Sequence, residues 1–376
     1  MSRNADIAKI LGRSEKDNAG NQSLVTPGRN LVINGAMQVA QRGTSFTSQT
    51  TGGYKTVDRF YQQILNFGTW DITHDTDVPT GQGFTKSAKW VCTTADASPA
   101  VNDHVVFYQM IEAQNLQRLK YGTSNANSLT ASFWVKSNKT GIYTIELYKP
   151  DQTVQQISKT ISITSADTWE YKTVTFPGNT SSGIDNDNGI GLYFVIWIGV
   201  GPDYNSGTFS NGSWANAVDA NRVSSNNVNL GDSTSNYINF TGIQLEEGNT
   251  ATPFEHKPYV QDMTECLRYF NRYRKTNSYG EFVTIRTYSA TQGTGLHQFP
   301  TPMRAAPTLS IDKTVNGTYF SYNLNAITIL GTDGNFTGCG FHATSASNSF
   351  VAGGGAVIQS NAVQDISFNL NAELFA

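Results

Sequence analysis

The stretch "LTASFWVKS" at residues 129–137 decides the fold class, because its side chains alternate in character along the chain. Leu129, Ala131, Phe133 and Val135 fall on one face of an extended segment, and the residues between them fall on the other. A period of two is the pattern of a strand with one buried face. The segment therefore predicts a half-buried β-strand.

Further segments of this kind, rich in β-branched and aromatic residues and bounded by Gly, Asn, Asp and Ser turns, follow along the chain. They are 141–148, 159–164, 170–176, 191–200 and 237–246. The run 191–200 is apolar on both faces, which indicates a central place in a sheet. A helix-like stretch at 111–120 is expected to cross one end of the fold. Short strands at this density predict an all-β jelly-roll sandwich.

The chain is long enough for two or three domains, at 376 residues. We expect residues 1–28 to form an N-terminal attachment segment and residues 29–258 to form the jelly roll. Pro253 and Pro258 mark a short, stiff connection. Residues 259–376 then form a smaller, β-sandwich-like domain.

The N-terminal segment is predicted to be a short helical or extended anchor. Asn4 is placed to cap a helix in which Ile7, Ile10 and Leu11 share one face, and Gly12 is placed to end it. So short a helix is unstable alone in water. We therefore expect these three apolar residues to attach the chain to a partner or a neighbouring subunit.

The second domain is predicted to begin with a segment of helical or mixed spacing. In residues 261–275 an apolar side is formed by Cys266, Tyr269, Phe270 and Tyr273. Short β segments follow, at 281–289, 307–312, 326–330, 356–360 and 365–376.

Charge and cysteine content narrow the class of partner. Charged residues make up 15% of the chain and the net charge is -3. Because no run of five Lys or Arg occurs, nucleic acid is a poor candidate partner. The N-terminus lacks the apolar core of a secretion signal, and the apolar run 191–201 is too short for a membrane-spanning helix, so we expect a soluble protein without membrane insertion. Cys92, Cys266 and Cys339 are widely spaced and are expected to be reduced, packed thiols.

The sequence does not predict a catalytic or metal site. Glu246 and Glu247 are adjacent in an expected strand, so they point to opposite faces, whereas a glycosidase needs two carboxyl groups that face one bond. We expect one to bond a loop or the backbone and the other to be solvated. The histidines lie thirty or more positions apart and form no metal-binding pattern. No cofactor is predicted.

Residues 183–191, "GIDNDNGIG", resemble a calcium loop. Aligned on Asp185, however, the sixth and twelfth positions are Ile190 and Ile196, where an EF-hand needs Gly and Glu. We predict a turn whose Asn and Asp side chains bond their own backbone. A structural calcium in the jelly roll remains an alternative. The run "GGG" at 353–355 is interpreted as a flexible turn or a place of close backbone approach.

The long polar segment 201–236 carries Tyr204, Phe209 and Trp214. Exposed aromatic rings are typical of sugar-binding surfaces. Trp214 is therefore either a platform for a sugar or a pin that holds the segment on the sandwich. We favour the pin.

A series of motifs resembles a family of phage virion proteins, the tail fibres and related appendages, whose central domain is a carbohydrate-binding-module-like jelly roll. The motifs are "NLVINGAMQVAQRGTSF" (30–46), "VDRF" (57–60), "SLTASFWVKSNKTGIYTI" (128–145), "TFSNGSWANA" (208–217), "VNL" (228–230) and "FTGIQLEEGNTATPFE" (240–255). "ECLRYFNRY" (265–273), "FPTPMRAAPTLS" (299–310) and the closing "AEL" resemble the small C-terminal β domain of such fibres. The resemblance covers roughly residues 30–376.

The resemblance implies a homotrimer on the particle of a bacteriophage, synthesised in the host cytoplasm. Its N-terminus would bind a tail or adaptor protein and its C-terminal domain would face the host. It also implies that Trp214 and residues 244–254 are structural signatures of the fold. The sequence departs from the commonest fibre pattern, because no long tail-binding domain precedes the jelly roll.

Three functions are compatible with this resemblance. The first is a non-enzymatic tail fibre that binds a host-surface glycan or envelope receptor through weak, multivalent contacts. The second is a head-decorating or tail-assembly structural protein without receptor binding. The third, a polysaccharide depolymerase, lacks the expected carboxylate arrangement. In the C-terminal domain, receptor contacts are predicted near Gly- and Ser-rich turns, at Tyr319, Tyr322, Phe341 and His342.

Overall fold

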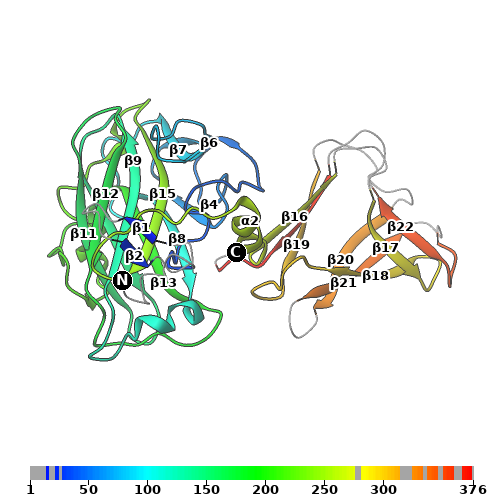
Figure 1. Ribbon diagram of the computed structural model, residues 1–376. Coiled ribbons are helices and arrows are strands. Elements are labelled where there is room, and N and C mark those ends of the chain that lie inside the picture. The colour runs from blue at the N-terminus through cyan, green and yellow to red at the C-terminus, as the bar shows by residue number, and fades with distance from the viewer. Residues whose placement is uncertain are drawn as a thin grey trace. The chain divides into compact units, whose positions relative to one another are not determined.

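Antiparallel β-sheets form nearly all of the regular structure (Figure 1). The computed structural model describes residues 14–16, 22–24, 28–275, 281–313, 324–332, 337–345, 350–359 and 366–374. The chain divides into two units, residues 1–259 and residues 260–376. The first unit is a jelly-roll sandwich of two sheets, which confirms the predicted all-β fold class.

One layer of the sandwich is a seven-stranded sheet in the order β14-β11-β10-β13-β8-β5-β4. Strand β13 is its central strand, as the two apolar faces of that segment predicted. The bounds are β4 (Gly53–Tyr54), β5 (Phe60–Leu65), β8 (His104–Glu112), β10 (Gly141–Lys149), β11 (Gln155–Ile163), β13 (Ile190–Val200) and β14 (Ala215–Asn216).

The other layer is a six-stranded sheet in the order β12-β9-β15-β7-β6-β3. Each predicted strand from 129 to 246 is present in one of the two layers. The bounds are β3 (Ser45–Gln49), β6 (Thr69–Asp75), β7 (Ser87–Thr94), β9 (Leu129–Ser137), β12 (Glu170–Phe176) and β15 (Tyr237–Glu247).

Short helices of the 3-10 type connect these strands. The stretch expected to be helical at 111–120 forms η1 (Ala113–Leu119), which coils at one end of the sandwich (Figure 1). The long segment after β13 contains η2 (Pro202–Tyr204), η3 (Asp219–Asn221) and η4 (Leu230–Asp232).

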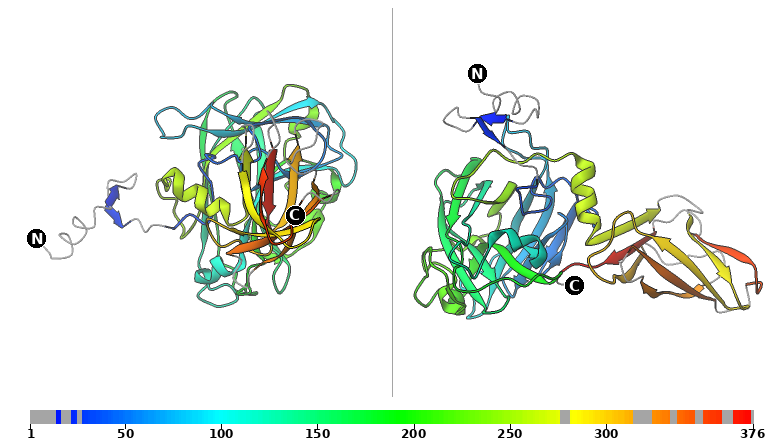
Figure 2. Two further views of the ribbon diagram at one scale, coloured as in Figure 1. Left: turned by 90° about the vertical axis from the view of Figure 1, so that its right-hand side faces the viewer. Right: turned by 60° about the horizontal axis from the view of Figure 1, so that its bottom comes forward.

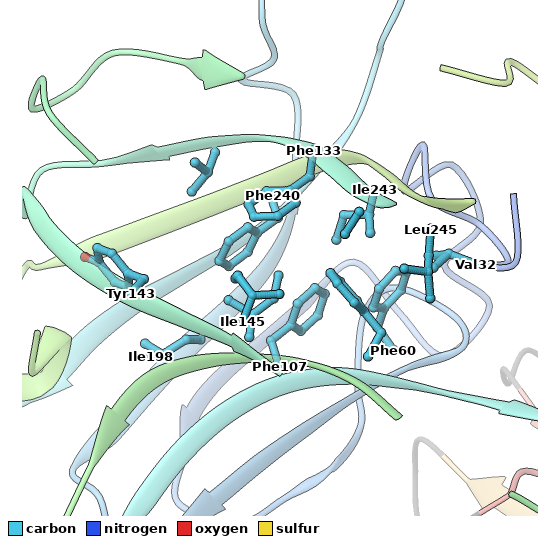
Figure 3. Close-up of a cluster of buried hydrophobic side chains, with 14 of the residues drawn as sticks. Val32, Phe60, Phe107, Phe133, Tyr143, Ile145, Ile198, Phe240, Ile243 and Leu245 are labelled. Carbon is cyan, nitrogen blue, oxygen red and sulfur yellow. The ribbon is translucent and has the colours of Figure 1, made fainter. Parts of the chain in front are cut away.

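The core lies between the two sheets and is rich in aromatic rings (Figure 3). Phe60 and Phe107 of the seven-stranded sheet stack with centroids 4.7 Å apart. Phe107 also stacks on Phe240 of the six-stranded sheet, at 5.5 Å. The predicted inward face of β9 is buried, including Phe133, which packs edge-on against Phe240. These contacts hold the layers together through apolar burial.

The segment that leads into the jelly roll is bonded to the segment that leaves it. The backbone N–H groups of Gly28 and Asn30 donate to the two carboxylate oxygens of Glu255, at 2.5 and 2.9 Å. Arg29 donates from Nε to Thr252 Oγ1 at 2.9 Å and from a terminal nitrogen to the carbonyl of Pro253. The two ends of the jelly roll are therefore joined by a polar clamp.

The second unit contains a helix, a three-stranded sheet (β16-β23-β19) and a five-stranded sheet (β20-β21-β18-β17-β22). The mixed segment after residue 258 is a helix followed directly by a strand (Figure 2). The bounds are α2 (Tyr259–Leu267), β16 (Phe270–Lys275), β17 (Glu281–Thr287), β18 (Gln292–Gln298), β19 (Thr308–Lys313), β20 (Leu324–Thr332), β21 (Gly338–Ser345), β22 (Gly355–Gln359) and β23 (Ile366–Asn371).

In the N-terminal segment, β1 (Ser14–Lys16) pairs antiparallel with β2 (Gln22–Leu24). The proposed attachment residues Ile7, Ile10 and Leu11 lie outside the described residues. Within the described part of the chain, no helix is long and apolar enough to cross a bilayer. The three cysteines are buried and form no disulfide bond, which confirms their prediction as packed thiols.

Candidate functional site

The outer face of the seven-stranded sheet carries five tyrosines in a row. Tyr54, Tyr61, Tyr108, Tyr193 and Tyr148 come from β4, β5, β8, β13 and β10, which are successive neighbours in the sheet. Their consecutive ring centroids lie 5.1, 5.1, 5.6 and 5.7 Å apart. All five residues are half-buried. We call them the tyrosine row.

Strand alternation turns the row away from the core. Phe60 and Phe107 are fully buried between the sheets. Because successive side chains of a strand point to opposite faces, Tyr61 and Tyr108 point outward. The core thus fixes the orientation of the row.

The register of the sheet aligns the rings. Tyr54 lies opposite Tyr61, Tyr61 lies opposite Tyr108, and Tyr148 lies opposite Tyr193. The remaining step, from Tyr108 to Tyr193, is diagonal, because the partner of Tyr108 on β13 lies two residues further along the strand. Direct and diagonal neighbours are both within reach of aromatic side chains.

One step of the row is a stacked ring pair and three are edge-to-face. Tyr61 and Tyr108 are stacked with an interplanar angle of 20°, and the other three steps have angles of 60 to 86°. The hydroxyl of Tyr54 is buried, so it does not face water. Among the described residues, the hydroxyls of Tyr108, Tyr148 and Tyr193 have no hydrogen-bond partner and are not buried. They are available to a ligand.

A buried ion pair stands at the β10 end of the row. The Arg222 guanidinium lies 4.6 Å from the ring centroid of Tyr148 and 5.1 Å from that of Trp197. Its Nε and one terminal nitrogen donate to the two oxygens of Glu146, at 2.8 and 3.0 Å. Trp197 Nε1 donates to the same carboxylate at 2.9 Å. Glu146 is 0% exposed, so the pair is formed out of water.

This pairing keeps the arginine charged. Burial alone would lower the pKa of Arg222, but the Glu146 carboxylate outweighs burial and the pKa of the guanidinium lies above its usual range. The segment that carries Arg222 also covers the neighbouring part of the outer face. There Val223 and Tyr204 pack on Trp197, which is 2% exposed.

The β4 end of the row has a similar arrangement. The Arg42 guanidinium lies 5.0 Å from the ring centroid of Tyr54. Its terminal nitrogen is 3.7 Å from the carboxylate of Asp58, which is 1% exposed. The same carboxylate accepts hydrogen bonds from the backbone and side chain of Gln41, at 3.0 and 2.6 Å. Both ends of the row thus carry an arginine that is paired with a buried carboxylate.

The titratable groups on this face are neutral at pH 7 unless they are paired. Burial raises the pKa values of Tyr61, Tyr108, Tyr148 and Tyr193, so the phenols keep their protons. Burial also lowers the pKa of His104, whose Nδ1 is 3.0 Å from the carbonyl of Asn102. The row is therefore a set of neutral groups that both donate and accept hydrogen bonds.

The adjacent glutamates behave as predicted. Glu246 is 2% exposed, and its Oε1 accepts hydrogen bonds from the N–H of Thr252 at 2.7 Å and from Gln244 at 2.9 Å. Glu247 is exposed on the opposite face and accepts a hydrogen bond from Asn127 at 2.6 Å. The pair is therefore structural, and its two carboxylates face different sides of β15.

Trp214 acts as a pin, which confirms the favoured interpretation. Its Nε1 donates to the carbonyl of Pro177 at 2.7 Å. Its ring contacts Tyr121 edge-on, with centroids 5.7 Å apart, and packs against the core of the sandwich. The ring therefore holds the long segment on the sandwich.

The resemblance of residues 183–191 to a calcium loop has a structural explanation. Asp187 Oδ1 accepts a hydrogen bond from the N–H of Gly189 at 2.8 Å, which confirms the predicted turn. Beside this turn, the ammonium of Lys149 donates to four oxygens at 2.5 to 3.0 Å. Among the described residues, no group of three or more His, Cys, Asp or Glu is arranged to hold a metal ion.

Of the four predicted receptor contacts, Tyr319 and Tyr322 lie outside the described residues. Phe341 was wrongly predicted to be a surface contact. It is 5% exposed, because it lies on the same face of β21 as the buried Cys339 and Ala343 and packs against Phe368 in the core of the second unit. His342 faces outward, and its Nε2 is 2.9 Å from the hydroxyl of Tyr288, which is 45% exposed.

The sequence analysis did not find the tyrosine row. A signal was present in the run 191–200, where Tyr193, Val195 and Trp197 form a second apolar face beside the core face. We interpreted that face only as a sign of a central strand. The other tyrosines gave no signal, because the rows of a sheet are assembled from strands that are distant in sequence.

No protein-family model and no curated protein matches the chain. Solved structures with some similarity include an enzymatically active domain of tailspike protein 4 from bacteriophage CBA120, with 14% identity and a TM-score of 0.33 over 61% of this chain and 23% of that one. A putative sugar-binding protein from Bacteroides thetaiotaomicron has 10% identity and a TM-score of 0.30 over 58% and 99% of the two chains. A family 11 carbohydrate-binding module from Clostridium thermocellum has 13% identity and a TM-score of 0.27 over 54% and 96%. At these scores the likenesses support no inference about function.

Proposed function

We propose that this chain is a bacteriophage virion protein of the tail-fibre type that attaches to the host surface by binding a glycan without cleaving it. The assignment to a fibre rests on the resemblance of residues 30–376 to that family. The observation that carries glycan binding is the tyrosine row, whose half-buried rings lie on the outer face of a sheet together with the accessible hydroxyls of Tyr108, Tyr148 and Tyr193.

The chemistry of the row matches that of a sugar chain. A sugar presents C–H groups and hydroxyls side by side, and tyrosine edges and phenols offer an apolar surface together with groups that donate and accept hydrogen bonds. The rings come from five neighbouring strands, so a chain of several sugar units could lie across them. Contacts of this kind are weak singly, and three copies in a homotrimeric fibre would raise the effective concentration.

The carboxylates beside the row support binding without catalysis. Glu146 and Asp58 are buried and paired with Arg222 and Arg42. Hydrolysis of a glycoside needs two carboxyl groups that face the same bond, one of which delivers a proton. A carboxylate that is held in an ion pair is poorly suited to that role.

The remaining assignments complete the proposal. Residues 1–28 would attach the chain to a tail or adaptor protein through Ile7, Ile10 and Leu11. Residues 259–376 would face the host and add a second contact at His342. That contact would include the exposed ring of Tyr288, which is bonded to His342.

The test measures binding of the purified chain to polysaccharide extracted from host cells. Tyr108→Ala combined with Tyr193→Ala removes the centre of the row, and we expect about tenfold or greater weakening, since aromatic contacts at the centre of a binding surface dominate its energy. Tyr171→Ala is the matched control, because Tyr171 is 41% exposed but lies on the six-stranded sheet. Its binding should stay unchanged.

Other outcomes would favour the alternatives. Equal binding by the double variant and the native chain would remove the row from the proposal. If the native chain bound no host glycan and imaging placed it on the head of the particle, the protein would be a head-decorating component. Release of reducing sugar ends from the polysaccharide would instead indicate a depolymerase.

A further inference from the structure

The charges around the tyrosine row are compensated within the protein. At one end, Arg222 is bonded to Glu146 and its remaining terminal nitrogen is 3.5 Å from Asp219. At the other end, Arg42 is paired with Asp58. At both ends of the row, the arginine charge is therefore already paired with a carboxylate.

The lysine next to Tyr54 in the sequence points elsewhere. Lys55 follows Tyr54 directly, and its Cε and Nζ lie beside Gly53. In an extended chain, residues two apart share a face and adjacent residues point to opposite faces. Lys55 therefore shares the face of Gly53 and points away from Tyr54. His104, the histidine on this face, is kept neutral by burial. The row has no free positive charge among these neighbours.

An anionic sugar would have to displace Glu146 to gain a bidentate contact with the Nε edge of Arg222. Glu146 is 0% exposed, and removing its partner would leave a buried, unpaired carboxylate. A buried charge without a partner is strongly unfavourable. Displacing Glu146 from Arg222 therefore costs more free energy than a new ion pair at the surface would contribute. The exposed Asp219 carboxylate would also repel an anion.

We propose that the tyrosine row selects an uncharged glycan and that Arg222 is a positioning residue, which holds Tyr148 and Trp197 in place instead of binding an acidic sugar. This inference rests on the proposed function. The guanidinium lies over both rings while Glu146 fixes its plane by two hydrogen bonds. Arginine stacks on aromatic rings and pairs bidentately with carboxylates in this way.

The experiment compares glycans that differ in charge but not in size. The full-length chain is titrated with neutral glucan, galactan and mannan oligosaccharides and with host polysaccharide fragments, each in native, hydroxyethylated and carboxymethylated form. We expect the carboxymethylated form of a bound glycan to bind about tenfold or more weakly than its hydroxyethylated form. Binding of the neutral form should not change between about 50 mM and about 500 mM NaCl, because only charged contacts are screened.

Variants then separate positioning from anion binding. Arg222→Met should weaken binding of the neutral glycan several-fold without creating a salt dependence. Arg222→Met combined with Glu146→Gln should recover part of the loss, because the unpaired buried carboxylate is removed together with its partner. The salt series uses the native chain alone. It therefore shows whether charged contacts contribute to glycan binding even if Arg222→Met does not fold.

Each outcome is informative. Tighter binding of the carboxymethylated form, with an affinity that falls as salt rises, would overturn the inference while leaving glycan binding intact. Equal binding of the carboxymethylated and hydroxyethylated forms would overturn it as well. If the native chain bound none of the glycans, the proposed function itself would fail.

Discussion

Lys149 shows how single residues stabilise the loops of the jelly roll. Its side chain is 0% exposed, and its ammonium donates to the carbonyls of Asp151, Thr153 and Gly183 and to the hydroxyl of Ser182. Burial lowers the pKa of this lysine, and the nearby Asp151 and Asp185 act in the opposite direction. The ammonium thus joins the loop after β10 to the loop after β12, as a bound cation would.

Replacing this lysine tests that role. Lys149→Met should lower the free energy of unfolding by about 2–4 kcal/mol, because four oxygens that are buried or partly buried lose a charged donor. The measurement is urea unfolding, with Lys120→Met as the control, since Lys120 is exposed. A chelator should leave the unfolding temperature of the native chain unchanged. Equal stability of the two variants, or strong destabilisation by a chelator, would contradict this account.

At the scale of residues, local alternation was predictive where we applied it. It correctly placed Glu246 and Glu247 on opposite faces of β15. It would also have placed Phe341 inward, since Cys339 and Ala343 have the same parity and are buried. The hydrogen bonds of Lys149 were not predictable, because their four acceptors come from two loops that meet only in the folded chain.

Single elements also depend on charged side chains at their ends. In the turn between β11 and β12, Glu170 Oε1 accepts hydrogen bonds from the N–H groups of Thr164 and Ser165, each at 2.8 Å. Burial would raise the pKa of Glu170, but these bonds and one from Lys172 outweigh it and lower the pKa to about 2. The ionised carboxylate therefore stabilises the turn.

Glu170→Gln should lower the free energy of unfolding by about 1–2 kcal/mol at pH 7, with solvent screening taken into account. Because the pKa of Glu170 is lowered in the folded state, the ionised carboxylate stabilises the fold at pH values above its ordinary pKa of 4.5. This stabilisation is lost as the pH falls from 4.5 toward about 2. The difference between native and variant chains should thus be constant above about pH 5 and shrink below it.

Urea unfolding at a series of pH values checks this prediction. Asp203→Asn serves as the control, because Asp203 is an exposed carboxylate in η2. A difference between Glu170→Gln and the native chain that stayed the same down to about pH 2 would show that ionisation of Glu170 is not involved.

Strands in which apolar and polar residues alternate strongly could be predicted from the sequence, and other strands could not. β9 and β12 have the bounds that the sequence indicated. The stretch at 111–120 folds as a 3-10 helix because its buried residues, Ala113, Leu116 and Leu119, recur every three positions. β18 and β21 were missed, because they are rich in Gly and polar residues and owe their structure to pairing with neighbouring strands.

At the scale of the whole molecule, the fold class followed from composition and periodicity, but the candidate site did not. Tyr54 and Tyr61 are far in sequence from Tyr148 and Tyr193, and only the strand order brings them into one row. The clamp between Gly28 and Glu255 likewise joins residues from opposite ends of the jelly roll. Both features depend on topology, which periodicity does not specify.

The most direct test of the proposed function is a competition between the purified chain and the phage particles that we propose carry it. Native chain added in excess to host cells should occupy the glycan and slow adsorption of the particles. The double variant Tyr108→Ala and Tyr193→Ala should not slow adsorption. Its unfolding temperature must match that of the native chain, which shows that the variant is folded. If the double variant blocked adsorption as well as the native chain does, the tyrosine row would not be the surface that meets the host.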